Sequence, residues 1–287
     1  MRYALLPLLA LALAACGGAT APAAGTLAVA ASIYPAAYLA ERVGGDAVMV
    51  TRLVPDGAEA HDYEPSPSDL RALAGASLLV LNGLGLEPWV ERAQASLGAD
   101  APVSVTLAGD AASDDSHVWL DPLTVQAMTE RLRVAFAAAA PEHADAFAAN
   151  AAALVADLDV LHAEFTGGLA SCRLRVFVTS HAAYGHLAAR YGLEQQAIAG
   201  LTPEAEPSPA RLAELTDMMR EQGIGLVLVE PLHEGGAADV LAAEVGASLR
   251  AVHPLESVIE PERTAFGDYL GMMRDNLAAL REALECA

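Results

Sequence analysis

The sequence contains no lysine: all 16 basic residues are arginine, and 37 acidic residues give a formal net charge of -21 at pH 7. A chain with so few basic groups is unsuited to present the clustered positive face that binds phosphate, so we expect no contact with nucleic acid. Cations are the more natural partner. Aromatic residues make up only 5% of the chain, so its cores must be built from leucine, valine and alanine.

Long apolar runs are also scarce. One run, Tyr3 to Leu13, follows Arg2 and leads through small residues to Cys16, which is typical of a secretory signal peptide. About eleven apolar residues are too few for a lasting membrane helix, which needs about 20. The pattern LAAC resembles a bacterial lipobox, which implies lipidation of Cys16; a plain signal peptide is the alternative. We find no second run of spanning length, so residues 1–25 are expected to be a signal peptide and tether that hold the protein outside a membrane.

Cysteine is rare as well, since only Cys172 and Cys286 remain after Cys16. An exported compartment permits them to pair, and such a bridge would tie the C-terminal end to the start of the second half. Two free thiols are the alternative, and sequence spacing does not decide between them.

What is present is a repeat. Short apolar runs alternate with helical stretches, which predicts an α/β fold with parallel sheets and crossover helices. Three segments of the first half match the second half: SIYPAAYLAERVG (32–44) with SHAAYGHLAARYG (180–192), EPSPSDLRAL (64–73) with EPSPARLAEL (206–215), and LLVLNG (78–83) with LVLVEP (226–231). The first half carries about six extra residues between its second strand and its EPSP turn. We therefore predict two similar lobes, 26–140 and 169–287.

A long amphipathic helix is predicted between the lobes, over residues 141–168. Its apolar residues recur at steps of three and four: Phe147, Ala151, Leu154, Leu158, Leu161 and Phe165. Pro141 suits the first turn, and Gly167 and Gly168 end the helix. About 25 residues would extend about 37 Å, long enough to brace both lobes. No Gly/Pro hinge separates the lobes, so a small rigid tilt is expected in place of a wide closure.

Ligands of open parallel sheets bind beyond the carboxyl ends of the strands. Four side chains follow strands in this way: His61 after 47–54, His117 after 102–107, His181 after 174–180 at the start of a helix, and Glu256 after 248–252. Three imidazoles and one carboxylate, two groups from each half, can converge on one point. This set suits tetrahedral zinc, whereas calcium and magnesium prefer six or more oxygen ligands or retained waters.

At these residues the chain resembles the zinc- and manganese-binding receptors of bacterial ABC importers, of the cluster A-I type. The motifs that carry the resemblance span nearly the whole chain: GAEAHDYEPSPSDL (57–70), SHVWLDP (116–122), SHAAYGHLAARYG (180–192), VLVEPLHEGG (227–236) and YLGMMRDNLAAL (269–280). The resemblance implies a monomeric, lipid-anchored, periplasmic or extracytoplasmic protein without enzymatic activity. Such a receptor captures zinc and delivers it to a permease with an ATPase subunit.

The resemblance also implies roles for single residues. His61, His117 and His181 match three ligands of that group, and Glu256 stands where the group commonly has Asp, with Glu59 and His233 as reserves for the fourth position. Histidine at position 181 goes with zinc, whereas Glu there favours manganese, so manganese is the alternative. The His-rich loop that the zinc group often carries is replaced by the short acidic stretch 108–116. Accessory metal capture would therefore fall to Asp110, Asp114 and Asp115.

Other residues have simpler interpretations. Glu230, at the end of a strand, is expected to accept a hydrogen bond from a ligand imidazole. His143 and His162, on the predicted linker helix, are expected to face water or to pack, and His186 and His253 are expected to have structural roles. Two other functions stay open, a zinc hydrolase with an open coordination position and an adhesion or structural lipoprotein with an incidental metal. The sequence has no HExxH motif, which disfavours the hydrolase.

Overall fold

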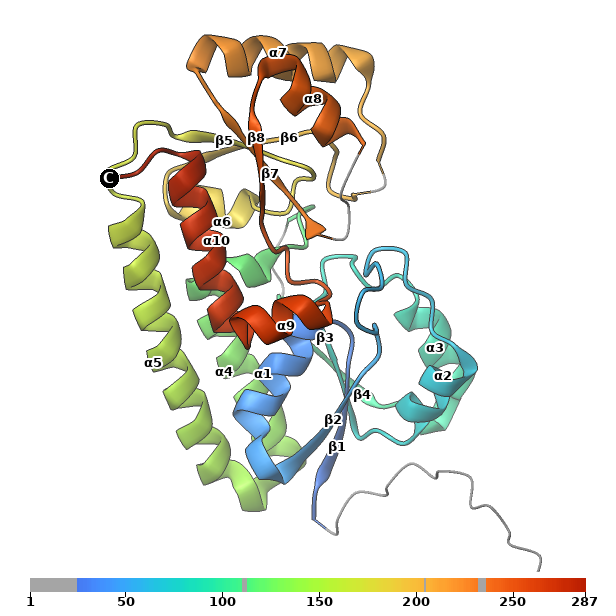
Figure 1. Cartoon of the computed structure of the whole chain (residues 1–287). Coiled ribbons are helices and arrows are strands. Elements are labelled where there is room, and N and C mark those ends of the chain that lie inside the picture. The colour runs from blue at the N-terminus through green and yellow to red at the C-terminus, as the bar shows by residue number, and fades with distance from the viewer. Residues whose placement is uncertain (1–24, 110–112, 204, 232–235) are drawn as a thin grey trace, which may run out of the picture.

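The computed structural model describes residues 25–109, 113–203, 205–231 and 236–287, which form two lobes, each built on a four-stranded parallel sheet (Figure 1). The predicted α/β class with two similar lobes is confirmed. Cys16 and the rest of the expected signal peptide lie outside the described residues, as do Asp110 and His233.

The first lobe alternates strands and helices as its apolar runs predict. Its elements are β1 (Leu27–Ala31), α1 (Tyr34–Gly44), η1 (Gly45–Ala47), β2 (Val48–Arg52), α2 (Pro67–Ala74), β3 (Leu78–Leu81), α3 (Val90–Leu97), η2 (Gly98–Asp100) and β4 (Val103–Thr106). All strands pair in parallel, in the order β2-β1-β3-β4. The central strands β1 and β3 consist of leucine, valine and alanine and are mostly buried, whereas β4 is an exposed edge.

The second lobe repeats this order. Its elements are β5 (Val176–Thr179), α6 (Gly185–Arg190), β6 (Glu194–Ala197), α7 (Pro209–Gln222), β7 (Leu226–Val229), α8 (Ala237–Val245), β8 (Ser248–Ala251), α9 (Glu260–Phe266) and α10 (Tyr269–Ala283). The strands are again parallel, in the order β6-β5-β7-β8, with β5 and β7 buried at the centre. Equivalent strands therefore point their carboxyl ends at equivalent edges.

The two EPSP turns fold alike. Ser66 and Ser208 cap α2 and α7, and their side chains accept from the backbone N–H groups of Asp69, at 3.3 Å, and Arg211, at 3.1 Å. The predicted placement of six extra residues is wrong in part, because the connection 53–66 has 14 residues and the connection 198–208 has 11. The rest of the difference lies earlier, because the connection 32–47 has 16 residues and the connection 180–193 has 14, and because β2 has five residues and β6 has four.

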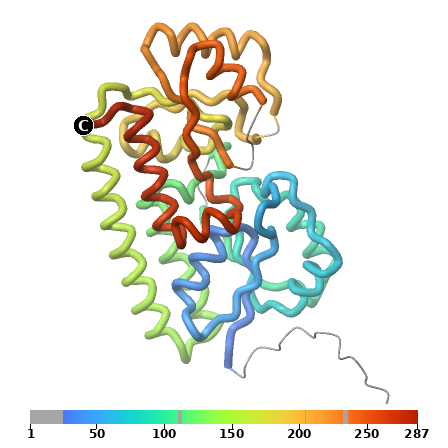
Figure 2. The backbone as a smooth tube through the Cα atoms, viewed as in Figure 1, coloured from blue at the N-terminus to red at the C-terminus, as the bar shows by residue number. Residues whose placement is uncertain are grey.

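The lobes are joined through η3 (Val118–Leu120), α4 (Pro122–Ala139), η4 (Pro141–His143) and the long helix α5 (Ala144–Gly168), which runs along one side of the molecule (Figure 2). The predicted linker helix is confirmed, with a single 3-10 turn before its first α-helical residue. All six of its predicted apolar residues are buried: Phe147, Ala151, Leu154, Leu158, Leu161 and Phe165. Cys172, just beyond α5, forms a disulfide with Cys286 beside the C-terminus.

By length and composition, Pro141–Gly168 is apolar enough to cross a membrane, so the expectation that no second run reaches that length is wrong. Its apolar side is covered by protein, however, because α5 packs against α1, α4 and α10. We therefore interpret α5 as a helix of the core. The larger buried cluster continues from one lobe into the other, so the lobes share apolar packing as well as a linker.

Candidate metal centre

The four side chains predicted as metal ligands come together between the lobes. One nitrogen of each of His61, His117 and His181 and one carboxylate oxygen of Glu256 all lie within 4.8 Å of one another. Among the residues that the structure describes, this is the one such group of three or more His, Cys, Asp or Glu side chains. Each stands in a connection that follows a strand, and each lobe supplies two of them.

The spacing of the donor atoms fits one small cation. Nε2 of His117 lies 3.3 Å from Nε2 of His181, and Nε2 of His61 lies 3.3 Å from Oε2 of Glu256. Oε1 of Glu256 lies 2.9 Å from Nε2 of His117 and 3.5 Å from Nε2 of His181. A tetrahedral site with zinc–ligand bonds of about 2.0–2.1 Å would place neighbouring ligand atoms about 3.3–3.4 Å apart. These four separations, from 2.9 to 3.5 Å, are close to those of a tetrahedral site.

The cluster is largely removed from water. The side chains of His117, His181 and Glu256 are only 0%, 1% and 5% exposed, and that of His61 is 10% exposed. Nε2 of His61 is itself buried and makes no hydrogen bond, although a Glu256 oxygen lies 3.3 Å away. A buried nitrogen without a hydrogen bond is costly, so this atom suits a position that a cation fills.

His181 reaches the cluster from a turn, which corrects the prediction that it begins a helix. The chain bends over residues 180–184, and α6 starts only at Gly185, whereas α1 starts directly after Ile33. The carbonyl of His181 accepts from Thr179 Oγ1 at 2.7 Å and from Gln195 Nε2 at 2.9 Å. These bonds occupy the backbone acceptor of His181 and hold it out of the helix.

Two carboxylates orient the imidazoles of His117 and His181 through contacts with their Nδ1 atoms. Nδ1 of His117 lies 2.7 Å from Oδ1 of Asp115, and Nδ1 of His181 makes a short contact with Oε1 of Glu230. A carboxylate on Nδ1 fixes the ring tautomer and turns the Nε2 lone pair toward a metal. Glu230 was expected in this role. Asp115 was expected as an accessory metal ligand, and its spacing of two residues before His117 is the signal that indicates the contact it makes.

These contacts shift the pKa values of the side chains in the cluster. Burial alone would lower the pKa of His181, but hydrogen bonds to Glu230 and Glu256 outweigh it and raise that pKa to about 10. For His117, burial is likewise outweighed by Asp115 and Glu256, so its pKa is raised. Burial would raise the pKa of Glu256, yet the three imidazoles hold it well below its usual range. A cation at this point must therefore displace protons from histidine.

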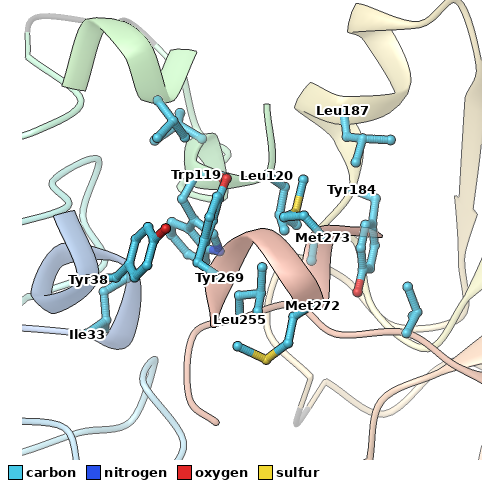
Figure 3. Close-up of a cluster of buried hydrophobic side chains, with 14 of the residues drawn as sticks. Ile33, Tyr38, Trp119, Leu120, Tyr184, Leu187, Leu255, Tyr269, Met272 and Met273 are labelled. Carbon is cyan, nitrogen blue, oxygen red and sulfur yellow. The ribbon is translucent and has the colours of Figure 1, made fainter. Parts of the chain in front are cut away.

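The segment that carries Glu256 is fixed by contacts far apart in the sequence. Leu255 has φ +66° and is 1% exposed, so a left-handed residue directly precedes the ligand position. The carbonyl of Pro254 accepts from Trp119 Nε1 at 2.6 Å, and the carbonyl of Trp119 accepts from the Tyr269 hydroxyl at 2.5 Å. Figure 3 shows Trp119, Tyr269 and Leu255 in the same buried cluster. Trp119 thus couples the His117 segment to the Glu256 segment.

Glu59, the reserve candidate that the structure describes, stands apart from the four. Glu59 is outside the donor group, and its Oε1 accepts from the backbone N–H of His61 at 3.1 Å. His253 contacts Glu262 and Asp275, and His186 contacts the carbonyl of Asp115, so both have local partners as predicted. His162 contacts the Tyr191 hydroxyl, and His143 the carbonyl of Gly25.

Comparison with known proteins gives consistent matches. The family model of the periplasmic zinc-uptake complex component A, ZnuA, matches residues 29–283. The chain is 32% identical over 282 residues to the zinc-binding lipoprotein AdcA of Streptococcus pneumoniae, covering 91% of this chain but 56% of AdcA. It is 29% identical over 277 residues to the high-affinity zinc uptake system protein ZnuA of Bacillus subtilis, covering 89% of this chain and 87% of that one.

A solved structure agrees with these relatives. The Zn(II)-bound ZnuA-like domain of Streptococcus pneumoniae AdcA matches with a TM-score of 0.81 and 33% identity, over 91% of this chain and 100% of that one. The chain thus spans little more than half the length of the full pneumococcal protein.

Proposed function

The chain belongs to the family of the periplasmic zinc-uptake complex component A, and from that premise we propose that it captures one zinc ion outside the cytoplasmic membrane for import. The observation that carries the proposal is the four-donor cluster, with three imidazole nitrogens and one carboxylate oxygen within 4.8 Å of one another. We infer that His61, His117, His181 and Glu256 are the four ligands of that ion.

The donor set supports zinc as the cargo. Neutral imidazole suits borderline zinc, whereas manganese prefers carboxylate, carbonyl and water ligands in larger numbers. One carboxylate offsets half of the charge of the ion. Asp115 and Glu230 add negative charge behind two of the imidazoles, which strengthens both as ligands.

Four protein ligands also favour a receptor over an enzyme. A catalytic zinc site keeps a position open for water or substrate, and a site closed by four protein groups does not. We therefore propose that the loaded protein docks on an ABC permease whose ATPase subunit drives import. We further propose that the receptor is a monomer anchored through lipidated Cys16.

Titration of the purified protein with zinc and with manganese tests this function. We expect one zinc ion per chain and much weaker binding of manganese, with zinc binding weakened by His181→Ala. In cells, deletion of the gene should slow growth in zinc-poor medium, and added zinc should restore it. Absence of zinc binding would refute the proposal, and hydrolysis of ester or peptide substrates that His61→Ala abolishes would favour the enzyme.

A further inference from the structure

The donor cluster adjoins a small pocket on one side. Ala58, Glu59 and Ala60 line it from the first lobe, and Pro254, Ser257 and Glu262 line it from the second. Glu256 belongs to both the pocket wall and the cluster, so the pocket adjoins the cluster. Of the four proposed ligands, His61 is the most exposed, and it follows Ala60 in the pocket wall. The pocket therefore lies next to the most exposed of the four ligands.

The acidic residues among those that line the pocket suit a cation. Glu59, Glu230, Glu256 and Glu262 all line it, and no arginine is among the described residues of its wall. Closely spaced carboxylates in a partly enclosed pocket raise the local concentration of a divalent cation. The pocket thus has the charge expected of a path along which zinc moves.

Contacts across some 200 residues of sequence hold this side of the cluster shut. The backbone N–H of Gly57 donates to Ser257 Oγ at 2.8 Å, and Ser257 Oγ donates to the carbonyl of Pro55 at 3.4 Å. Arg263 of α9 donates to both carboxylate oxygens of Asp56, at 2.7 and 2.9 Å. These bonds tie segment 55–57, which leads into the His61 segment, to the second lobe.

We propose that this pocket is the path by which the cation reaches and leaves the cluster, and that Ser257 and Arg263 keep the path closed. The inference rests on the proposed function only in requiring that zinc binds. Opening moves segment 55–61 away from the second lobe and carries His61 with it. Gly57, with φ +73°, supplies a turn beside the Ser257 anchor that few other residues adopt.

The proposal has a kinetic consequence. None of the closing groups belongs to the four-donor cluster, so their bonds stabilise the closed zinc-free and the closed zinc-loaded protein equally. Loss of these bonds lowers the barrier to opening from both forms. Association and dissociation rates of zinc should therefore rise together, while the dissociation constant stays unchanged.

Stopped-flow transfer of zinc to a chromogenic chelator, and zinc binding from a buffered solution, measure the two rates. We expect Arg263→Gln to raise both about two- to five-fold, the size set by an exposed ion pair, and Ser257→Ala to act similarly. The double variant should exceed either single variant. Each dissociation constant should stay within about two-fold of the wild-type value.

Arg274→Gln is the matched control. The Arg274–Glu164 pair joins α10 to α5 away from the pocket, and its side chains are 44% and 37% exposed, against 43% and 40% for Arg263–Asp56. Its zinc rates should equal those of the wild type. Unchanged rates in the double variant, or faster release with an equal loss of affinity, would overturn the proposal. Failure of the wild type to bind zinc would instead refute the proposed function.

Discussion

The two lobes share one sheet order and one capped EPSP turn, yet they bring different chemistry to the same edge. In the first lobe, the Ser32 hydroxyl donates to Glu87 at 2.6 Å; in the second, the Ser180 hydroxyl donates to Glu230 at 2.7 Å. Each lobe therefore places a serine after its first strand against a glutamate. Among the described residues, only the glutamate of the second lobe also contacts an imidazole, that of His181.

The repeat locates the cause of this difference. In the matched segments, Ile33 stands opposite His181 and Asn82 opposite Glu230. Ile33 is 1% exposed and packs in the core, while Glu87 accepts from the backbone of Asn82 at 2.8 Å. The duplicated fold thus supplies two equivalent sheet edges, and single substitutions decide which positions at those edges can bind a metal.

The largest effect should come from removing this difference. His181→Ile gives the second lobe the residue that the first lobe has, and it deletes one of four proposed ligands. A structural zinc site is worth about 10–16 kcal/mol, so one ligand in four corresponds to a loss of roughly 100- to 1000-fold in affinity. Competition with a zinc chelator measures this. Ile33→Val, in the first lobe, should leave zinc affinity within two-fold; equal losses in both variants would contradict the account.

The disulfide is expected to add stability to the second lobe and not to the first. Cys172 and Cys286 are 114 residues apart in sequence, and the bond they form constrains only the second half of the chain. Replacing both by serine should lower the free energy of unfolding by about 2–4 kcal/mol, because the unfolded chain gains freedom. Denaturant melts of the zinc-free protein check this, and zinc affinity should change by less than three-fold. A large loss of zinc affinity would mean that the bond also shapes the site.

Removing either carboxylate that contacts a ligand imidazole should lower zinc affinity by a smaller factor, and that factor should differ between the lobes. Glu230→Gln should weaken zinc binding about 10- to 100-fold, because His181 loses the acceptor that orients it. Asp115→Asn should cost less, because the Asp115 side chain is 19% exposed and water can replace it, against 2% for Glu230. Chelator competition on both variants ranks them. The reverse order would break the proposed asymmetry.

Whether the sequence predicts a feature of this site depends on how far apart in the sequence the contacting residues lie. The position of His61, His117, His181 and Glu256 after strands could be predicted, because parallel strands end at one edge and the strands are visible as apolar runs. The amphipathic pattern of α5 gave all of its buried residues.

Contacts between distant segments could not be predicted in this way. The turn at His181 depends on Gln195, and the Glu256 segment depends on Trp119, 135 residues from its partner Pro254. No local pattern reports such pairs, since each exists only after the lobes have packed.

The smallest effect that we expect is on the number of protons released when zinc binds. The pKa of His181 is raised to about 10 because Glu230 and Glu256 outweigh its burial, so at pH 8 this ring carries a proton that zinc must displace. Calorimetric titrations in two buffers of different ionisation enthalpy should show release of at least one proton per zinc at pH 8, decreasing as pH passes 10.

The raised pKa of His181 also stabilises the zinc-free fold at pH values below the ordinary histidine pKa of 6.5, and that stabilisation is lost as pH rises toward 10. Glu230→Gln should reduce the release, and no release at pH 8 would contradict the assigned pKa.

X-ray absorption spectroscopy of the zinc-loaded protein tests the central claim most directly, that two side chains from each lobe bind one ion. We predict four nitrogen or oxygen neighbours at about 2.0–2.1 Å, with multiple scattering from three imidazoles, and from two in His181→Ile. A spectrum with six oxygen neighbours, or with fewer than three imidazoles in the wild type, would contradict it.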